Sequence, residues 1–147
     1  MKRTALTWTL LLSLLGLSLA LAHGGHAHFG GHAHFGVFPA WYSAAQAERG
    51  RALSLRQCAA CHGPRLEGRY APPLAGPRFL ARWGGCTAEE LARYVAARMP
   101  QGRAGTLKEA EVLDLLAFIL QSNGYPAGTR DLEPGFLPQI WILGNPG

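Results

Sequence analysis

The sequence has few residues that could hold a metal in an ordinary protein site. Of 147 residues, three are cysteine and two are methionine. Five of the six histidines are crowded into residues 23–34, and the chain has a single closely spaced pair of cysteines. A structural zinc site needs four ligands, commonly drawn from two such pairs, so this scarcity argues against zinc.

Other absences exclude further classes of protein. No strand-helix-strand pattern surrounds the cysteine pair, which argues against a thioredoxin-type redox dithiol. The basic residues are not interleaved with a recognisable nucleic-acid-binding motif, so no nucleic-acid partner is expected. The length is too short for two domains and predicts one small domain with extensions.

The cysteine pair belongs to the run Cys58-Ala59-Ala60-Cys61-His62. Residues at positions i, i+3 and i+4 share one face of a helical turn. Both sulfurs could then bond to the vinyl groups of a haem while His62 reaches the iron. A disulfide, a redox dithiol or half a zinc site are the alternatives. We favour one covalently attached haem c, because the spacing is specific for it in an exported protein.

The amino-terminal 22 residues match the pattern of a secretory signal peptide. Lys2 and Arg3 precede an apolar run from Leu6 to Leu19, and Ala20-Leu21-Ala22 forms a small-x-small cleavage site. The expected location is therefore periplasmic or otherwise extracytoplasmic. The alternative is an uncleaved membrane anchor, although the run is short for the roughly 20 residues that span a bilayer.

Residues 23–42 are predicted to be a His/Gly-rich arm followed by an apolar lead-in. Gly-His-Ala-His-Phe-Gly occurs at 25–30 and again at 31–36, and so many glycines predict flexibility. Imidazoles in such a tract could bind a divalent transition metal weakly, or the repeat could be an unselected linker. The histidines concerned are His23, His26, His28, His32 and His34.

Helix signals follow from residue 43 onward. Ser43 is a suitable cap for a helix from Ala44 to about Gln57. Gly50 interrupts it at a cost of about 1 kcal/mol relative to alanine, which indicates that another helix crosses closely there, with Phe118 the expected contact. Two capping-box patterns, Thr87-x-x-Glu90 and Thr106-x-x-Glu109, predict two more helices. The last should end near Gly124, and the pattern predicts an all-α fold of three to five short helices.

Met99 precedes Pro100 at the expected end of the second of these helices. Apart from Met1 it is the only methionine, so a thioether ligand to the haem iron can come only from Met99. A second histidine is the competing ligand, and filling a gap in the core is the ordinary role of methionine. We favour Met99 as the ligand.

The segment between the haem motif and that helix is predicted to be a loop over residues 63–76. Its Tyr70-Ala71-Pro72-Pro73-Leu74 run is rigid, and a carbonyl there could accept the second ring N–H of His62. The alternative is a simple proline turn. Phe79 and Trp83 could line the haem pocket, with the Trp83 N–H reaching a propionate, or could simply pack in the core.

Residues 125–147 are rich in proline and glycine but carry many large apolar side chains. These either cover the domain's own surface, which we favour, or form a patch for a partner. They are Phe136, Leu137, Ile140, Trp141, Ile142 and Leu143. Cys86 is the odd thiol, available for intermolecular pairing if exposed and inert if buried.

Charge is unevenly distributed along the chain. Residues 23–105 hold ten arginines against four glutamates, and residues 106–147 hold two basic against five acidic side chains. This asymmetry could steer an acidic partner towards the haem-bearing half, or it could serve solvation and pairing with haem propionates.

Residues 43–124 resemble class I c-type cytochromes, and most closely the monohaem domains associated with quinoprotein dehydrogenases. The likeness rests on four stretches: Gln46-Ala-Glu-Arg-Gly-Arg-Ala-Leu with Cys-Ala-Ala-Cys-His-Gly, Ala71-Pro-Pro-Leu-Ala-Gly, Met99-Pro, and Leu115-Leu-Ala-Phe-Ile-Leu with Asn123-Gly-Tyr-Pro-Ala-Gly. The resemblance implies the cytochrome c fold around one covalently bound haem.

The same resemblance implies roles for individual residues. Cys58 and Cys61 would be the thioether sites, and His62 and Met99 the axial ligands. Pro72 would supply the carbonyl to His62, Leu74 would pack on the haem, and Gly50 would meet Phe118. The sequence departs from the family at Leu53-Ser54-Leu55, where an aromatic often stands, at Cys86 and in the histidine arm.

The implied function is the carriage of single electrons by Fe3+/Fe2+ cycling between respiratory or dehydrogenase partners. With both axial positions filled, no site remains for enzymatic chemistry. The expected partners are a dehydrogenase, a cytochrome complex or a terminal oxidase, with membrane contact only through an uncleaved signal segment. The alternatives are a tightly bound electron-accepting subunit of a periplasmic dehydrogenase, a haem sensor or peroxidase-like protein with a labile Met99, and a metal-handling protein.

Overall fold

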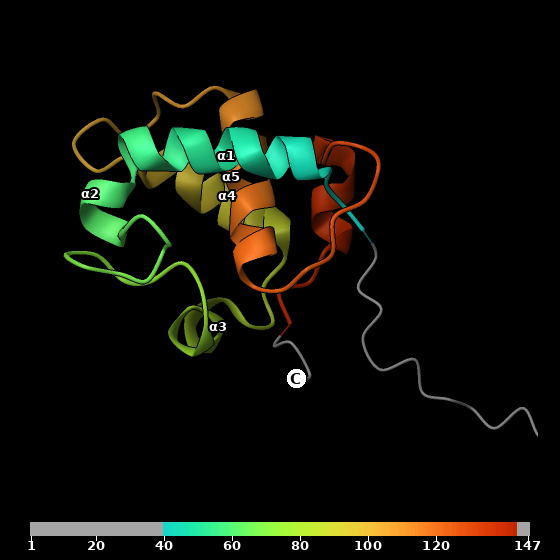
Figure 1. The fold of residues 1–147 in the computed structure, drawn as a ribbon, viewed down its shortest axis with the longest axis horizontal. Coiled ribbons are helices and arrows are strands. Elements are labelled where there is room, and N and C mark those ends of the chain that lie inside the picture. The colour runs from blue at the N-terminus through green and yellow to red at the C-terminus, as the bar shows by residue number, and fades with distance from the viewer. Residues whose placement is uncertain (1–39, 144–147) are drawn as a thin grey trace, which may run out of the picture. The chain divides into compact units, whose positions relative to one another are not determined.

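A computed structural model describes residues 40–143 of the chain. In this range the elements follow in the order α1 (Ala44–Gln57), α2 (Ala59–His62), α3 (Pro77–Trp83), α4 (Ala88–Arg98), α5 (Glu109–Ser122) and the 3-10 helix η1 (Pro134–Gln139) (Figure 1). Extended pairing in the described range is limited to two isolated bridges. The prediction of an all-α fold is therefore confirmed.

The predicted signal peptide and the histidine arm lie outside the described residues. His23, His26, His28, His32 and His34 belong to that part of the chain. Within residues 40–143, no helix has the length and apolar character needed to span a lipid bilayer.

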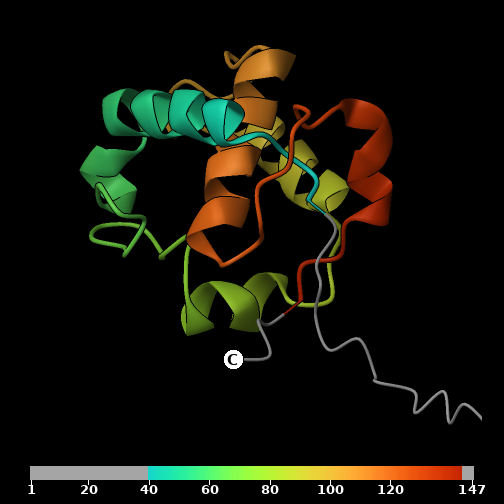
Figure 2. The same cartoon turned by 45° about the vertical axis from the view of Figure 1, so that its right-hand side comes forward.

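Helices α1 and α5 cross in direct contact, and Gly50 lies at the crossing (Figures 1 and 2). A Cβ atom built on Gly50 would lie 1.8 Å from the carbonyl oxygen of Asp114 and 3.0 Å from Cβ of Phe118. Because the nearest obstacle is backbone, no rotamer change could relieve it. The sequence-based pairing of Gly50 with Phe118 is confirmed, and the crossing requires glycine.

The starts of α1 and α4 follow the sequence signals. The Ser43 hydroxyl accepts the N–H of Gln46 at 3.0 Å, and α1 begins at the next residue after the cap. At α4 the Thr87 hydroxyl accepts the N–H of Glu90 at 3.3 Å, while the Glu90 carboxylate accepts the N–H of Thr87 at 2.7 Å. This reciprocal pair is the predicted capping box.

The predicted start of α5 at Thr106 is wrong. The Thr106 hydroxyl donates to the carbonyl of Arg103 at 2.7 Å and so closes the preceding turn. The helix begins later, with Lys108 as the cap residue, and the carboxylate of Glu111 accepts the Lys108 N–H at 2.9 Å. A local hydrogen bond to the preceding turn therefore competes successfully with the capping role of the threonine.

The tail packs on the helices, as the sequence led us to expect. Its apolar side chains Leu132, Leu137, Ile140 and Ile142 are buried. The N–H of Ala88 donates to the carbonyl of Ile140 at 2.8 Å, and the N–H of Ile142 donates to the carbonyl of Cys86 at 2.8 Å. The end of the described chain is thus fastened to the segment that opens α4.

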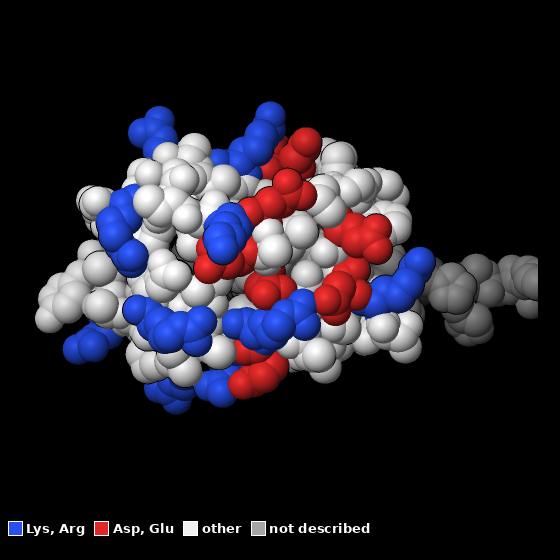
Figure 3. Space-filling view, turned by 90° about the horizontal axis from the view of Figure 1, so that it is seen from above, with Lys and Arg blue, Asp and Glu red and all other residues white. Residues whose placement is uncertain are grey.

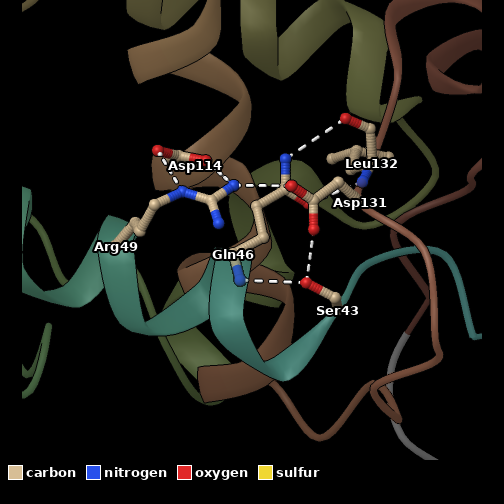
Figure 4. A network of polar contacts seen from close by, with 6 residues as sticks. All are labelled: Ser43, Gln46, Arg49, Asp114, Asp131 and Leu132. Atoms are coloured by element: carbon tan, nitrogen blue, oxygen red, sulfur yellow. Dashed lines mark hydrogen bonds and ion pairs between the residues drawn. The ribbon is translucent and has the colours of Figure 1, made fainter.

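Gln46 ties the tail to α1 (Figure 4). Its buried side-chain amide donates to the carbonyl of Leu132 at 3.2 Å and accepts the N–H of Leu132 at 2.6 Å. A side chain thus satisfies both backbone groups of a tail residue, which would otherwise be costly to bury. Beside it the Arg49 guanidinium contacts Asp114 of α5 at 3.0 Å and Asp131 of the tail at 2.6 Å.

We expect Asp131→Asn to lower the stability of the protein in a pH-dependent way. Hydrogen bonds from Ser43 and Arg49 hold the pKa of Asp131 below its usual value. A depressed pKa stabilises the fold above the unfolded-state value of about 3.9, and this contribution is lost as the pH falls through the folded-state value. Because the pair is exposed, the loss near neutral pH should be about 0.2–1 kcal/mol.

The measurement is thermal unfolding of both proteins between about pH 2 and pH 7, where the carboxylates titrate. The difference in Tm should be present at neutral pH and vanish at the acid end. Glu133→Gln is the matched control, since it neutralises a nearby tail carboxylate that forms no ion pair within residues 40–143. A difference that persists unchanged at acid pH would contradict the assignment.

Candidate functional site

The predicted haem motif occupies a single turn at the end of α1. Cys58 ends α1 and also precedes α2, and its backbone (φ −120°, ψ −31°) changes the direction of the chain. The N–H groups of Cys61 and His62 donate to the carbonyl of Cys58 at 3.1 and 2.9 Å. Both thiols and the imidazole are therefore borne on the same turn (green in Figure 1).

His62 is 9% exposed, and its Nδ1 lies 2.7 Å from the carbonyl oxygen of Pro72. A carbonyl can only accept, so Nδ1 carries the proton and donates. The lone pair is then on Nε2, which is the form of histidine that binds a metal. The contact is the one expected from the rigid proline run, and it fixes both the tautomer and the ring orientation.

The loop that supplies Pro72 is folded back on the motif. The carbonyl of Cys61 accepts the N–H groups of Arg69, Tyr70 and Ala71 at 3.1, 3.0 and 3.0 Å. The N–H of Gly68 donates to the carbonyl of His62 at 2.6 Å. These backbone bonds hold the loop in one position against the turn that carries His62.

A cavity of about 480 Å³ opens beside the motif. Its volume falls in the roughly 300–1,000 Å³ range of cofactor sites. Seven of the site residues proposed from the sequence line it: Cys58, Cys61, His62, Pro72, Leu74, Trp83 and Met99. Phe79 does not line it and is instead buried in the hydrophobic core. The lining is mostly apolar, and its apolar residues include Leu91 and Val95 of α4 and Leu115, Phe118 and Ile119 of α5.

Met99 reaches the cavity from a different element than His62. Its N–H donates to the carbonyl of Val95 at 2.9 Å, and its extended backbone ends α4. The side chain is half-buried and lies against the hydrophobic core. One cavity thus has a thioether on its wall as well as an imidazole and two thiols.

The Cys58 thiol lies in an apolar environment. Burial raises its pKa, a hydrogen bond with Ser54 acts in the opposite direction, and the nearby Cys61 raises it further. A thiol with a raised pKa is a poor candidate for a reactive redox dithiol, which needs a stabilised thiolate. Cys86 is half-buried and does not line the cavity.

The sequence-based prediction named Trp83 but missed the arginines and the tyrosine beside it on the cavity wall. The Arg82 guanidinium lies 5.9 Å from the ring centre of Trp83 and 5.7 Å from that of Tyr94, and the two rings meet edge to face at 5.3 Å. Arg98 also lines the cavity. The helical stripe Leu91, Tyr94 and Val95 could have revealed Arg98, because position i+7 continues the same face.

Asn123 was also missed, because the sequence pattern marks it only as part of a helix end. Its side chain donates to the carbonyl of Leu74 at 3.0 Å and accepts the N–H of Gly76 at 3.0 Å. The end of α5 thereby holds the cavity loop from behind. No local pattern shows this, because the partners are separated by nearly fifty residues of chain.

The donor set fits haem c. Two thiols and an imidazole with its lone pair on Nε2 share one turn, and they face a largely apolar cavity with a thioether on its wall. An all-α fold with this site defines a c-type cytochrome domain.

Comparison with known proteins specifies the class. Residues 45–119 match the family described as cytochrome C oxidase, cbb3-type, subunit III. The chain belongs to this family of cytochrome c domains, and its cofactor is haem c. The resemblance to class I c-type cytochromes is thereby confirmed.

The chain is similar to parts of larger redox proteins. Thiosulfate dehydrogenase of Allochromatium vinosum is 34% identical over 79 residues, which cover 48% of this chain and 29% of that protein. The crystal structure of the sulfane dehydrogenase SoxCD from Paracoccus pantotrophus is 31% identical with a TM-score of 0.54, covering 65% of this chain and 52% of that one. Thiosulfate dehydrogenase TsdBA of Marichromatium purpuratum is 33% identical with a TM-score of 0.43, covering 56% and 20%. The chain therefore spans about half or less of each relative's length.

Proposed function

We propose that this chain is an exported monohaem cytochrome that carries single electrons between protein partners. The observation that carries the proposal is the His62 Nδ1 to Pro72 carbonyl hydrogen bond of 2.7 Å, made at the wall of the cavity that also contains Met99. In the proposal, Cys58 and Cys61 form the thioether bonds, and His62 and Met99 are the axial ligands. The bound haem supplies the Fe3+/Fe2+ couple.

The chain's own residues would bind the haem, orient its histidine ligand and exclude water from the cavity. Pro72 keeps His62 in the metal-binding tautomer, and Leu74 with Phe118 contributes apolar wall. The guanidiniums of Arg82 and Arg98 on the cavity lining offer positive charge for the two haem carboxylates, and the Trp83 N–H is a further donor. Filling both axial positions leaves no open iron site, which favours a carrier over an enzyme.

Location and partners are part of the proposal. The signal-like residues 1–22 support an extracytoplasmic location, with the remaining chain divided into an arm (23–42), a haem domain (43–124) and an apolar tail (125–147). Basic side chains predominate towards the left of the face in Figure 3 and also lie among the acidic ones in its middle, whereas acidic side chains are absent from the left end. Such an arrangement orients a redox partner such as a dehydrogenase, a cytochrome complex or a terminal oxidase.

Replacing Met99 tests the ligand assignment. Met99→Leu keeps an apolar side chain of similar volume but removes the sulfur, so we expect loss of the weak far-red Met-to-iron absorption band and new binding of cyanide or carbon monoxide. The reduction potential should fall in Met99→His, because histidine ligation gives lower potentials than methionine ligation. Optical spectra and a redox titration of the purified holoproteins provide the measurement.

The parent protein is the control, and it should keep the far-red band and bind neither cyanide nor carbon monoxide. Binding by the parent protein would favour the sensor or peroxidase-like alternative. A Met99→Leu spectrum identical to that of the parent would show that another residue is the ligand.

A second candidate is the electron-accepting subunit of a dehydrogenase of sulfur compounds. The relatives that the chain matches are named as thiosulfate and sulfane dehydrogenases. In the tail, Trp141 is 52% and Leu143 is 49% exposed, which leaves apolar surface for a permanent partner. Deleting the tail would be a poor test, because it also removes buried residues such as Ile140. The mass of the native holoprotein in solution decides, since a lone monomer contradicts this candidate.

A further inference from the structure

A second concavity borders the Pro72 loop. It has a volume of about 430 Å³ and is lined by residues 67–73 together with Arg78 of α3. Its wall is mainly polar, in contrast to the haem cavity. Tyr70, Pro72 and the adjoining residues border both hollows, so the two hollows share one loop. We call this second hollow the Arg69–Arg78 groove.

The lining of the groove has an excess of positive charge, because Arg69 and Arg78 stand against one carboxylate, Glu67, which also attracts Arg69. Within residues 40–143, neither Arg69 nor Arg78 forms an ion pair with a carboxylate. The acidic residue of the lining, Glu67, is engaged within the loop, where its carboxylate accepts the N–H of Arg65 at 2.7 Å and lies against Gly63. Two guanidiniums are therefore left to pair with acceptors supplied from outside.

An exposed aromatic side chain stands beside them. Tyr70 is 85% exposed, and the Arg69 guanidinium lies 5.7 Å from the centre of its ring. Its backbone N–H is bonded to the Cys61 carbonyl at 3.0 Å, so the ring is presented by a fixed segment and not by a loose one. Tyrosine and arginine dominate the energetic centres of protein interfaces, and a preorganised backbone lowers the cost of binding.

We propose that the Arg69–Arg78 groove docks an acidic surface segment of the redox partner, with Tyr70 packed against that segment. The proposal rests on the proposed electron-carrier function and names the partner chemistry for it. Charge complementarity selects the occupant, since Asp and Glu carboxylates can pair bidentately with both guanidiniums. A protein segment also accounts for Tyr70, whose exposed ring would be left uncovered by a small anion.

Docking there places the partner against the loop that fixes His62. Pro72 lines the groove and its carbonyl accepts the His62 Nδ1–H. The docked partner would therefore lie on the histidine side of the haem site, against the loop that both hollows share. Because backbone hydrogen bonds join the loop to Cys61 and His62, binding at the groove should change the environment of the His62 ring.

The test is an NMR titration of the reduced, isotopically labelled holoprotein with an octaglutamate peptide at low ionic strength. We expect the amide signals of residues 67–73 and 78 and the His62 ring signals to shift. In Arg69→Glu/Arg78→Glu the affinity should fall at least about tenfold, because repulsion replaces pairing. The matched control Arg93→Glu/Arg130→Glu makes the same change in net charge at two exposed arginines outside the groove and should lose no more than about threefold.

Three outcomes would overturn the proposal. Equal losses in the two double variants would show that the peptide senses only net charge. Shifts confined to the Arg82 and Arg98 region would place docking at the haem cavity instead. Equal shifts with sodium sulfate at the same ionic strength would make the groove a site for small anions. In each case an unchanged visible spectrum would leave the electron-carrier function standing, so the two proposals fail separately.

Discussion

Replacing Cys58 and Cys61 together by serine is expected to abolish covalent haem attachment. Serine is close in size to cysteine but cannot form a thioether bond to the haem vinyl groups, so the product should lose its pigment on a denaturing gel. Both sulfurs belong to one turn, in which the N–H of Cys61 donates to the Cys58 carbonyl, and both residues line the cavity. The measurement is haem staining after electrophoresis, together with the mass of the intact chain, in a host with haem-attachment machinery.

Cys86→Ser is the matched control, because it makes the same chemical change at a cysteine outside the cavity lining. It should retain full haem content and the parent spectrum. Retention of covalent haem in the double variant would contradict the assignment of the motif. Loss of haem in Cys86→Ser with the fold intact would show that the third thiol takes part in attachment.

The variant Gly50→Ala is expected to destabilise the holoprotein by about 1–3 kcal/mol, as overpacking of a close contact does. Alanine would ordinarily stabilise a helix interior by about 1 kcal/mol relative to glycine. Here the added methyl group would lie 1.8 Å from the Asp114 carbonyl oxygen, so α1 and α5 would have to separate. The clash should outweigh the helix propensity and reverse the sign of the effect.

Denaturant unfolding of the holoprotein measures this, with Gly135→Ala as the control. A Cβ atom on Gly135 would meet nothing within 4 Å, and its φ angle lies outside the left-handed region. That variant should change the free energy of unfolding by no more than about 1 kcal/mol, and in the stabilising direction. Comparable stabilities for the two variants would mean that the helix crossing tolerates a side chain.

Local signals in the sequence predicted most of the helical frame. Ser43 and Thr87 begin helices because their hydroxyl groups satisfy nearby backbone donors, and this needs only residues a turn away. Gly50 and Phe118 were paired correctly because a glycine inside a helix lowers its stability, and a close helix crossing is a strong physical reason for it to stand there. The helix start predicted at Thr106 was wrong because its hydroxyl can bond to either of two local backbone groups, and sequence alone does not rank these two bonds.

The contacts that assemble the site were harder to foresee. Gln46 reaches Leu132 and Asn123 reaches Leu74 across long stretches of chain. Neither residue type is specific for such a bond, so no pattern announces it. The haem motif and Met99 could be proposed from the sequence because few other residues could form the thioether bonds or bind the iron. Arg82, in contrast, is one arginine among many and is distinguished only by its place in the fold.

The two hydrogen bonds between Gln46 and Leu132 also set an order of events during biosynthesis. The motif at His62 precedes Leu132 in the chain, so in a protein exported from its amino end the motif emerges first. Until the tail segment that contains Leu132 packs on α1, the side-chain amide of Gln46 is not buried. A chain exported in this way would present its attachment turn to the maturation apparatus while the protein is still open, and would close afterwards around its pigment.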